Sequence, residues 1–271
     1  MSDWSFSRAP FLLAGPCVLE EGDLPLRIAA RLAELGIRLG LPVCFKASFD
    51  KANRSRAGAP RGPGLDRGLE ILAAVRRESA LPVLTDIHEP GQAAPAAEVA
   101  DLLQVPAFLC RQTDLLAAAG RTGKPVNVKK GQWMAAEEMR GAIEKVRGDR
   151  STAELAVTER GTFFGYGDLV VDFRNLTRLR EATGVPVIFD ATHSVQHPGR
   201  GSGGSSGGSR KDIPPLLAGA AAAGVDGFYL ETHPDPACSP SDRETQWPLA
   251  DLEPLLVRTL RIWNAARESA P

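Results

Sequence analysis

Short apolar segments alternate with longer helical patterns along almost the whole chain, and this alternation limits the possible folds more than any other feature. Eight segments have the length and apolar character of strands: Phe11–Gly15, Val43–Ala47, Val83–Ile87, Leu102–Pro106, Pro125–Lys129, Leu155–Thr158, Val187–Asp190 and Gly227–Glu231. Helical patterns lie between or after them: Leu24–Leu35, Leu65–Glu78, Thr113–Ala119, Ala135–Val146, Leu176–Glu181, Pro215–Ala223 and Leu249–Arg267. Strands that alternate with helices build a parallel sheet, and eight such units in about 250 residues close into a barrel. The sequence therefore predicts an α/β fold, a (β/α)8 TIM barrel, with residues 1–271 in a single domain.

The composition is that of an ordinary globular enzyme, with 43% hydrophobic and 24% charged residues. A net charge of −1 gives no basis for a nucleic-acid or membrane surface. No apolar run approaches the roughly 20 residues that span a bilayer. The first ten residues include Asp3 and Arg8 and lack the apolar core of a signal peptide. The four cysteines match no zinc-finger spacing and nothing points to secretion, so we expect reduced thiols in a cytoplasmic protein. The charge and the short apolar runs lead us to expect that it binds neither nucleic acid nor membranes.

Polar side chains stand at the ends of most of the predicted strands. They are Cys17, Lys46, Ser48, Asp86, His88, Gln104, Lys129, Glu159, Arg160, Asp190, His193, Glu231 and His233. A strand with a purely structural role would more simply end in a turn residue. Active sites of this barrel class lie at the carboxyl ends of the strands, so the pattern predicts an active site there.

The second strand leads into a segment rich in hydrogen-bond donors. Lys46 and Ser48 have the spacing that places two strand residues on the same side. Four more donors follow in the loop: Lys51, Asn53, Arg54 and Ser55. Such a surface suits a phosphate and a hydroxylated carbon chain. The simpler interpretation is a solvated basic loop, but a lysine within an apolar strand argues against it.

The fifth and sixth strands supply further cations. Alternation places Asn127 and Lys129 toward the barrel interior and the neighbouring valines toward the outer helices, and leaves the direction of Lys130 open. Arg160 follows the sixth strand, and a lysine and an arginine on neighbouring strands can clamp a phosphate and a carboxylate. Three other polar residues belong to strands three and four or follow them: Asp86, Gln104 and Arg111.

Four residues form a candidate set of metal ligands: Cys17, His193, Glu231 and Asp242. One sulfur, one nitrogen and two carboxylates suit zinc, ferrous iron or manganese. Each also has a simpler interpretation. Cys17, expected at an exposed strand end, could be a small buried hydrophobe, His193 a hydrogen-bonded core histidine, and Asp242 a helix N-cap. Topology alone does not select these four from the other histidines and aspartates.

Residues 199–210 form a Gly/Ser-rich segment of low complexity. Such a segment cannot pack into a core, so we expect it to be mobile. It follows the seventh predicted strand and therefore lies on the catalytic face. A disordered surface loop is one interpretation, and a lid that orders over a substrate phosphate is the one that this position favours.

Eight segments together resemble one known family. They are Ala-Gly-Pro-Cys-Val-Leu-Glu at 14–20, Phe-Lys-Ala-Ser-Phe-Asp-Lys-Ala-Asn-Arg-Ser at 45–55, Thr-Asp-Ile-His-Glu at 85–89, Gln-Val-Pro-Ala-Phe-Leu-Cys-Arg-Gln-Thr-Asp at 104–114, Val-Asn-Val-Lys-Lys-Gly-Gln at 126–132, Thr-Glu-Arg-Gly at 158–161, Phe-Asp-Ala-Thr-His-Ser-Val-Gln at 189–196 and Leu-Glu-Thr-His-Pro at 230–234. The chain resembles the 3-deoxy-D-manno-octulosonate-8-phosphate synthases, also called 2-dehydro-3-deoxyphosphooctonate aldolases. The resemblance implies a transferase of lipopolysaccharide biosynthesis that condenses phosphoenolpyruvate with arabinose 5-phosphate and water, and releases phosphate.

The resemblance also implies roles for single residues. Catalysis would rest on Lys46, Asp86, Lys129, Arg160 and His193. Phosphoenolpyruvate would be clamped by Lys46, Ser48, Lys129 and Arg160 with Gln104 nearby, and arabinose 5-phosphate held by Lys51, Asn53, Arg54 and Ser55. Arg111 would reach that phosphate from an adjacent subunit of a homotetramer. One branch of the family has a cysteine at position 17 and needs a divalent metal, so Cys17 implies that branch, with His193, Glu231 and Asp242 as the other ligands. No residue is assigned as the general base.

Three other functions remain open at this point. A sister synthase that uses erythrose 4-phosphate would share the barrel, the phosphate clamp and the cysteine ligand. The sister family resembles Arg-Thr-Ser-Pro at the place where this chain has Lys-Ala-Asn-Arg-Ser, residues 51–55, and this difference argues against it. A Schiff-base aldolase would use Lys129 or Lys46 as nucleophile and would be indifferent to chelators. A non-catalytic phosphate-binding barrel would show no turnover.

Overall fold

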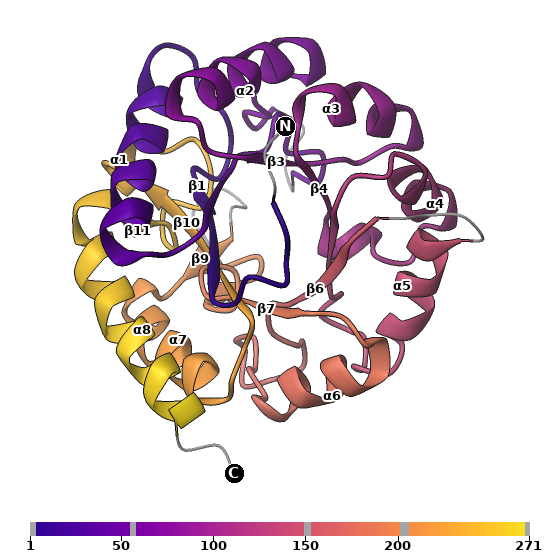
Figure 1. Cartoon of the computed structure of the whole chain (residues 1–271), viewed down its shortest axis with the longest axis vertical. Helices are drawn as coiled ribbons and strands as arrows, with labels where there is room; N and C mark the ends of the chain where they lie inside the picture. The colour runs from indigo at the N-terminus through magenta and orange to yellow at the C-terminus, as the bar shows by residue number, and fades with distance from the viewer. Residues whose placement is uncertain (1–3, 55–57, 149–152, 201–205, 269–271) are drawn as a thin grey trace.

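A computed structural model describes residues 4–54, 58–148, 153–200 and 206–268. Within these ranges, eight parallel strands close into a barrel: β1 (Phe11–Gly15), β2 (Val43–Lys46), β3 (Val83–Asp86), β4 (Leu102–Val105), β5 (Val126–Lys129), β6 (Leu155–Glu159), β7 (Val187–Asp190) and β10 (Gly227–His233). Each strand pairs with the next in chain order, and β10 pairs with both β7 and β1, which closes the ring. The predicted TIM barrel is therefore confirmed (Figure 1).

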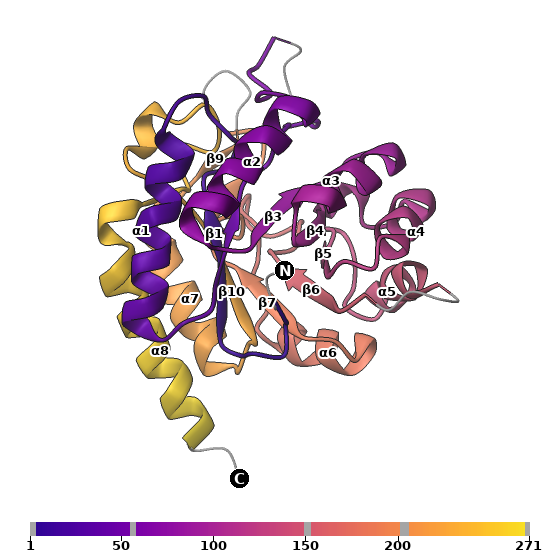
Figure 2. The same cartoon turned by 45° about the horizontal axis from the view of Figure 1, so that its top comes forward.

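Helices surround the sheet on its outer face (Figures 1 and 2). Within the same ranges they are α1 (Leu24–Leu39), α2 (Leu65–Ser79), α3 (Ala93–Val99), α4 (Thr113–Arg121), α5 (Met139–Arg147), α6 (Arg174–Thr183), α7 (Ile213–Ala222) and α8 (Leu252–Glu268). One stripe of each faces the strands, as Ile28, Leu32 and Leu35 of α1 do, because apolar residues at helical spacing share a face. Two short strands, β8 (Gln196–His197) and β9 (Gly207–Gly208), pair antiparallel, and β11 (Trp247–Pro248) extends the sheet beside β10.

The alternation of side chains along each strand divides the interior into two parts. Val126 and Val128 of β5 belong to the large apolar layer between strands and helices, while Asn127 and Lys129 point into the barrel, as predicted. A smaller apolar cluster inside the barrel includes Phe6, Phe11, Leu13, Cys44, Leu84, Leu102, Ala156, Ile188 and Tyr229. Trp4 packs edge-on against Phe11 at 5.5 Å between ring centroids. Apolar packing therefore fills the barrel below the polar strand ends.

Most predicted boundaries agree with the structure to within a few residues, and the exceptions have local causes. Helix α3 was missed because its seven residues are mostly alanine and show little periodicity. The helix predicted from Ala135 begins only at Met139, because residues 135–138 form a turn in which the Ala135 N–H donates to Glu138 Oε2 at 2.8 Å. None of the helices in the described ranges has the length and apolar character needed to cross a bilayer.

Candidate active site

A cavity of about 810 Å³ opens at the carboxyl ends of the strands. Its wall includes side chains from six strands or the loops directly after them: Lys46, Asp86, Gln104, Lys129, Arg160 and His193. Tyr229 and Glu231 of β10 complete the inner wall, and residues 51–54 and 240–244 form part of the rim. The structure thus gathers most of the polar strand ends predicted from the sequence around one space.

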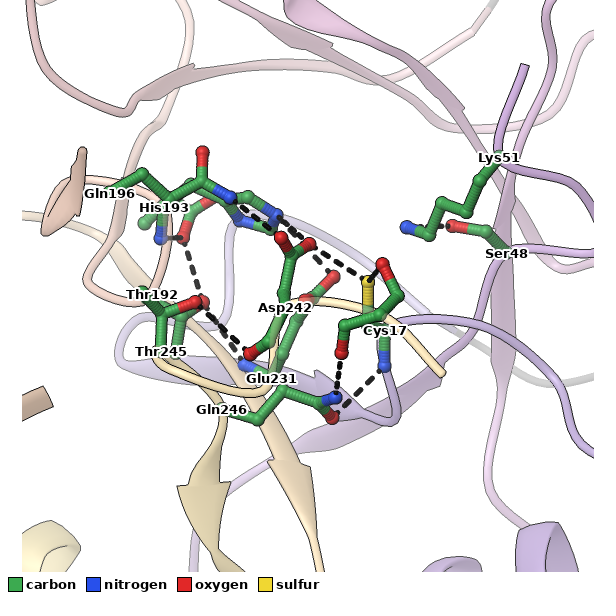
Figure 3. A network of polar contacts seen from close by, with 12 residues as sticks. Cys17, Ser48, Lys51, Thr192, His193, Gln196, Glu231, Asp242, Thr245 and Gln246 are labelled. Carbon is green, nitrogen blue, oxygen red and sulfur yellow. Dashed lines mark hydrogen bonds and ion pairs between the residues drawn. The ribbon is translucent and has the colours of Figure 1, made fainter. Parts of the chain in front are cut away.

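Cys17 lies directly behind this wall rather than at an exposed strand end. That expectation was wrong because residues 239–246 cover the loop after β1 and leave the Cys17 side chain fully buried. Its Sγ lies 3.0 Å from Asp242 Oδ2 (Figure 3). The same sulfur lies 3.0 Å from Ser241 Oγ. The Gln246 side chain joins the two segments, since Oε1 accepts from the Cys17 N–H at 3.2 Å and Nε2 donates to the Ser241 carbonyl at 2.8 Å.

His193 and Glu231 direct their side chains toward the same place (Figure 3). His193 Nδ1 lies 2.7 Å from Asp190 Oδ2, which leaves Nε2 at 3.6 Å from Glu231 Oε1 and 3.8 Å from Asp242 Oδ2. Ligand atoms of Cys17, Glu231 and Asp242 all lie within 4.8 Å of one another. One sulfur, one imidazole nitrogen and two carboxylates in this arrangement could hold a borderline divalent metal.

Two further features of the ligand set fit a bound cation. Glu231 Oε2 is buried and has no hydrogen-bond partner among the described residues, and an orphaned buried oxygen is costly unless something binds it. Burial, followed by the negative charges of Asp242 and Glu231, raises the pKa of the Cys17 thiol well above its ordinary value. The thiol therefore keeps its proton until a positive charge offsets these carboxylates.

Asp190 orients His193 from behind. Its Oδ1 accepts from the His193 backbone N–H at 2.9 Å, and its Oδ2 contacts both His193 Nδ1 and Lys129 Nζ, the latter at 2.6 Å. Burial opposes ionisation of this carboxyl, but the charges and hydrogen bonds of His193 and Lys129 outweigh it and hold the pKa of Asp190 well below its ordinary value. A carboxylate on the far nitrogen of a metal-ligating histidine fixes the ring and its tautomer.

Three buried cations line one side of the cavity. Lys46 Nζ donates to Glu231 Oε1 at 2.9 Å, and Lys129 Nζ lies 3.6 Å from the centre of the Tyr229 ring. Arg160 Nη2 donates to Gln196 Oε1 at 2.7 Å, while its Nη1 is buried without a hydrogen-bond partner in the described part of the chain. Burial lowers the pKa of Lys129 and of Arg160 from their ordinary values. A buried guanidinium with an unused N–H is ready to bind an anionic oxygen.

A belt of hydrogen bonds connects Ser48, just after β2, with inner residues of the next four strands. The Asp86 carboxylate accepts from Ser48 Oγ and from Gln104 Nε2. Gln104 Oε1 accepts from Asn127 Nδ2 at 2.8 Å, and Asn127 Oδ1 accepts from Thr158 Oγ1 at 2.8 Å. Burial opposes the charge on Asp86, but Lys46, Lys51 and Lys129 together lower its pKa. The side-chain amides of Gln104 and Asn127 are therefore each fixed in one orientation, because their oxygen and nitrogen atoms both have a hydrogen-bond partner in the belt.

A second group of cations stands at the rim, after β2. Lys51 Nζ donates to Ser48 Oγ at 3.0 Å, and Arg54 Nη1 donates to Ser241 Oγ at 2.9 Å. Burial opposes the charge on Lys51, but the nearby acidic groups of the cavity outweigh it and raise its pKa. Asn53 also lines the cavity, whereas Ser55 lies outside the described residues.

Some predicted positions are not brought into the cavity. Arg111 is exposed and absent from the cavity wall. Lys130, whose direction the sequence left open, turns away from the interior toward Glu159. Of the predicted lid, Gly199 and Ser206 border the cavity, while residues 201–205 lie outside the described ranges.

Sequence reasoning also missed several side chains that support the site: Thr158, Gln196, Tyr229, Ser241 and Gln246. Uncharged polar residues are common at many surfaces, so their type carried no signal. Strand alternation could have identified Thr158 and Tyr229, since both stand two positions before a predicted site residue on the same face.

Comparison with known proteins gives consistent matches over most of the chain. A family model described as the DAHP synthetase I family matches residues 7–261. The 2-dehydro-3-deoxyphosphooctonate aldolase of Nitratidesulfovibrio vulgaris (strain DP4) is 55% identical over 254 residues, which cover 94% of this chain and 92% of that relative. The protein of the same name from Verminephrobacter eiseniae (strain EF01-2) is 54% identical over 259 residues, covering 94% and 90%. That from Syntrophobacter fumaroxidans (strain DSM 10017 / MPOB) is 51% identical over 259 residues, covering 96% and 89%.

Proposed function

The chain belongs to the DAHP synthetase I family and, within it, to the 2-dehydro-3-deoxyphosphooctonate aldolases, and on this basis we propose that it condenses phosphoenolpyruvate with D-arabinose 5-phosphate and water. The products are 3-deoxy-D-manno-octulosonate 8-phosphate and inorganic phosphate. This is a transferase reaction that forms a carbon–carbon bond and serves lipopolysaccharide biosynthesis. The observation that carries the proposal is that two groups of cations line one cavity, beside the cluster of Cys17, His193, Glu231 and Asp242.

Phosphoenolpyruvate occupies the inner side of the cavity in this proposal. Its phosphate and carboxylate need at least two cationic partners. The cavity offers three buried cations for this role, Lys46, Lys129 and Arg160. The unused Nη1 of Arg160 supplies a donor for an anionic oxygen. Ser48 holds Lys46 by a hydrogen bond, and Ser48 and Gln104 both donate to Asp86.

Arabinose 5-phosphate occupies the rim. Lys51, Asn53 and Arg54 line that part of the cavity, and Ser55 follows them in the chain outside the described residues. A sugar bound there extends from the rim toward Asp86 and Glu231, so its aldehyde end is directed at the inner side. Two separate cation groups therefore suit two phosphorylated substrates that meet between them.

We propose that Cys17, His193, Glu231 and Asp242 hold a divalent metal, which would be zinc, ferrous iron or manganese. The orphaned Glu231 oxygen and the 3.0 Å contact between Cys17 Sγ and Asp242 support this set. When bound, such a metal supplies Lewis-acid polarisation of an oxygen that it contacts. The chain itself orients the ligands through Asp190, Gln196 and Gln246.

The residues of the chain contribute mainly positioning and charge to the reaction. The third carbon of phosphoenolpyruvate forms the new bond to the aldehyde carbon, water adds to the second carbon, and the bond between that carbon and the phosphate oxygen breaks. Lys129 and Arg160 offset the charge that stays on the departing phosphate. Glu231 and Asp86 both remain ionised, since the surrounding lysines hold their pKa values below the ordinary range despite burial.

Phosphate release from phosphoenolpyruvate, measured separately with arabinose 5-phosphate and erythrose 4-phosphate, tests the substrate assignment. Release with the five-carbon sugar alone supports the proposal, and preferential release with erythrose 4-phosphate would assign the sister synthase instead. Borohydride added during turnover distinguishes the Schiff-base alternative. Covalent trapping on Lys46 or Lys129 would contradict the proposed chemistry.

We further propose that the enzyme is a homotetramer in the cytoplasm and that Arg111 completes a neighbouring subunit's site. Large aromatic side chains stay exposed on the β4 to β6 side of the rim in the single chain, among them Phe108, Trp133 and Tyr166. Co-expression of Arg111→Ala with Lys46→Met tests this arrangement. Mixed oligomers regain activity if Arg111 acts across an interface, and they stay inactive if it acts within its own subunit.

A further inference from the structure

Behind the inner cations lies a buried ion pair that the proposed chemistry does not use. Lys130 follows β5 and Glu159 ends β6, and both side chains are fully buried. Lys130 Nζ lies 3.6 Å from Glu159 Oε2. Two buried charges are costly to keep, so a pair at this position calls for an explanation beyond stability.

Each member of the pair adjoins a residue that points into the cavity. Lys130 directly follows Lys129, and Glu159 directly precedes Arg160. Because successive residues of a strand face opposite sides, Lys130 and Glu159 point outward where Lys129 and Arg160 point into the cavity. The register aligns Lys129 with Thr158 on the neighbouring strand, so the two outward residues also meet. The contact between Lys130 and Glu159 therefore holds in place the backbone that carries Lys129 and Arg160.

The Glu159 carboxylate holds the turn that carries Arg160. Its Oε1 accepts from the backbone N–H of Arg160 at 2.9 Å and from that of Gly161 at 2.7 Å. Gly161 has φ +91°, a conformation that side chains disfavour, so the chain turns sharply at this point. The carboxylate thereby sets the direction in which the Arg160 side chain leaves the strand.

The Lys130 ammonium holds the neighbouring loops. It donates to the carbonyls of Gly131 and Met134, at 3.2 and 3.3 Å, and to Thr162 Oγ1 at 3.4 Å. With Glu159 beside it, this one group joins the end of β5, the loop after it and the loop after β6.

We propose that Lys130 and Glu159 are positioning residues that set Lys129 and Arg160 for the phosphate and carboxylate of phosphoenolpyruvate, an inference that rests on the proposed function. The pair touches neither substrate, and it acts only on the inner side of the cavity. Loss of the pair therefore weakens the binding of phosphoenolpyruvate selectively, while the rim residues that hold the sugar phosphate keep their places.

Steady-state kinetics of Lys130→Met, Glu159→Gln and the double variant test the inference. We expect the KM for phosphoenolpyruvate to rise about 10-fold or more, since small displacements of clamping residues are that costly, while the KM for arabinose 5-phosphate stays within about twofold. In the double variant neither buried charge is left unpaired, so its thermal stability exceeds that of Lys130→Met, but its KM for phosphoenolpyruvate stays raised. Glu159→Gln keeps an acceptor for the two backbone N–H groups but loses the charge opposite Lys130, so the KM for phosphoenolpyruvate rises because Lys130 no longer holds the loops in place. This variant decides the matter if Lys130→Met does not fold.

Asp101→Asn is the matched control. Asp101 is also buried, accepts from the Val83 N–H at 3.0 Å and pairs with Arg76 at 2.9 Å, but it lies at the amino ends of the strands. This variant should lose stability and keep both KM values. Unchanged KM for phosphoenolpyruvate in the pair variants, or an equal change in both KM values, would overturn the inference, whereas an inactive wild-type enzyme would refute the proposed function itself.

Discussion

Replacement of Asp190 by asparagine tests how the site holds its histidine and its inner lysine. Asp190 Oδ2 lies 2.6 Å from Lys129 Nζ and 2.7 Å from His193 Nδ1, and the carboxylate is fully buried. Asparagine keeps the shape of the side chain and removes the charge. Lys129 Nζ then keeps no carboxylate partner at hydrogen-bond distance among the described residues, and its remaining neighbours are His193 Nδ1 at 3.5 Å and the centre of the Tyr229 ring at 3.6 Å.

Removal of one partner from a buried ion pair lowers the free energy of unfolding by about 3–5 kcal/mol. Because Lys129 keeps its contact with the Tyr229 ring, we expect a loss near the lower value. For a chain of 271 residues, an unfolding entropy of about 2.1 cal/mol/K per residue amounts to about 0.57 kcal/mol/K. A loss of about 3 kcal/mol divided by that entropy lowers Tm by about 5 °C. Thermal unfolding of the metal-free protein, followed by circular dichroism, measures this shift.

The same variant also affects the proposed metal. Loss of a carboxylate behind a metal-ligating histidine weakens metal binding by about 10- to 100-fold, which titration against a competing chelator measures. Asp172→Asn serves as the control, because Asp172 pairs with the largely exposed Arg174 and its loss should lower Tm by no more than about 2 °C. A Tm shift for Asp190→Asn no larger than that of this control, with metal affinity unchanged, would refute the reasoning.

Three further substitutions test other parts of the site. Cys17→Asn should reduce the bound metal and leave activity that EDTA does not abolish, and chelator sensitivity equal to that of the wild type would show that Cys17 is not a ligand. Gln246→Met removes the link between two ligand segments, so metal retained through dialysis should fall about 10-fold or more, and full retention would contradict this role. In Gly15→Ala the new Cβ would lie 2.1 Å from the Lys46 carbonyl oxygen and displace the end of β2, so kcat/KM should fall at least about 10-fold. Gly120→Ala, outside the site, is the control for Gly15→Ala: its new Cβ would lie 1.9 Å from the Val146 carbonyl oxygen, where α4 meets α5, and should lower Tm while kcat/KM of the folded fraction is unchanged.

The fold could be predicted from the sequence because its signal is repetitive. Each strand of the barrel is a short, mainly apolar run, and each error concerns a boundary or a segment without periodicity, as at α3. The inward direction of Asn127 and Lys129 followed from alternation with the neighbouring valines, since a strand residue faces the side opposite to its neighbours.

The assembly of the site was harder to predict. Asp242 stands in the loop after β10 and meets Cys17, which is 225 residues away, only because that loop folds back over the end of β1. No spacing in the chain encodes this contact, and the resemblance to a known family supplied it. Burial of Cys17 was missed for the same reason. The Lys130 and Glu159 pair was visible only as two charged residues at strand ends, because alternation gives a direction but not a partner.

Phosphate release from phosphoenolpyruvate and arabinose 5-phosphate, measured before and after metal removal with EDTA and again after metal addition, tests the central claim most directly. We predict release with the untreated enzyme, loss of release after EDTA, and recovery with zinc, ferrous iron or manganese. Full activity in protein shown to be free of metal would contradict the claim that Cys17, His193, Glu231 and Asp242 form a metal site needed for the reaction.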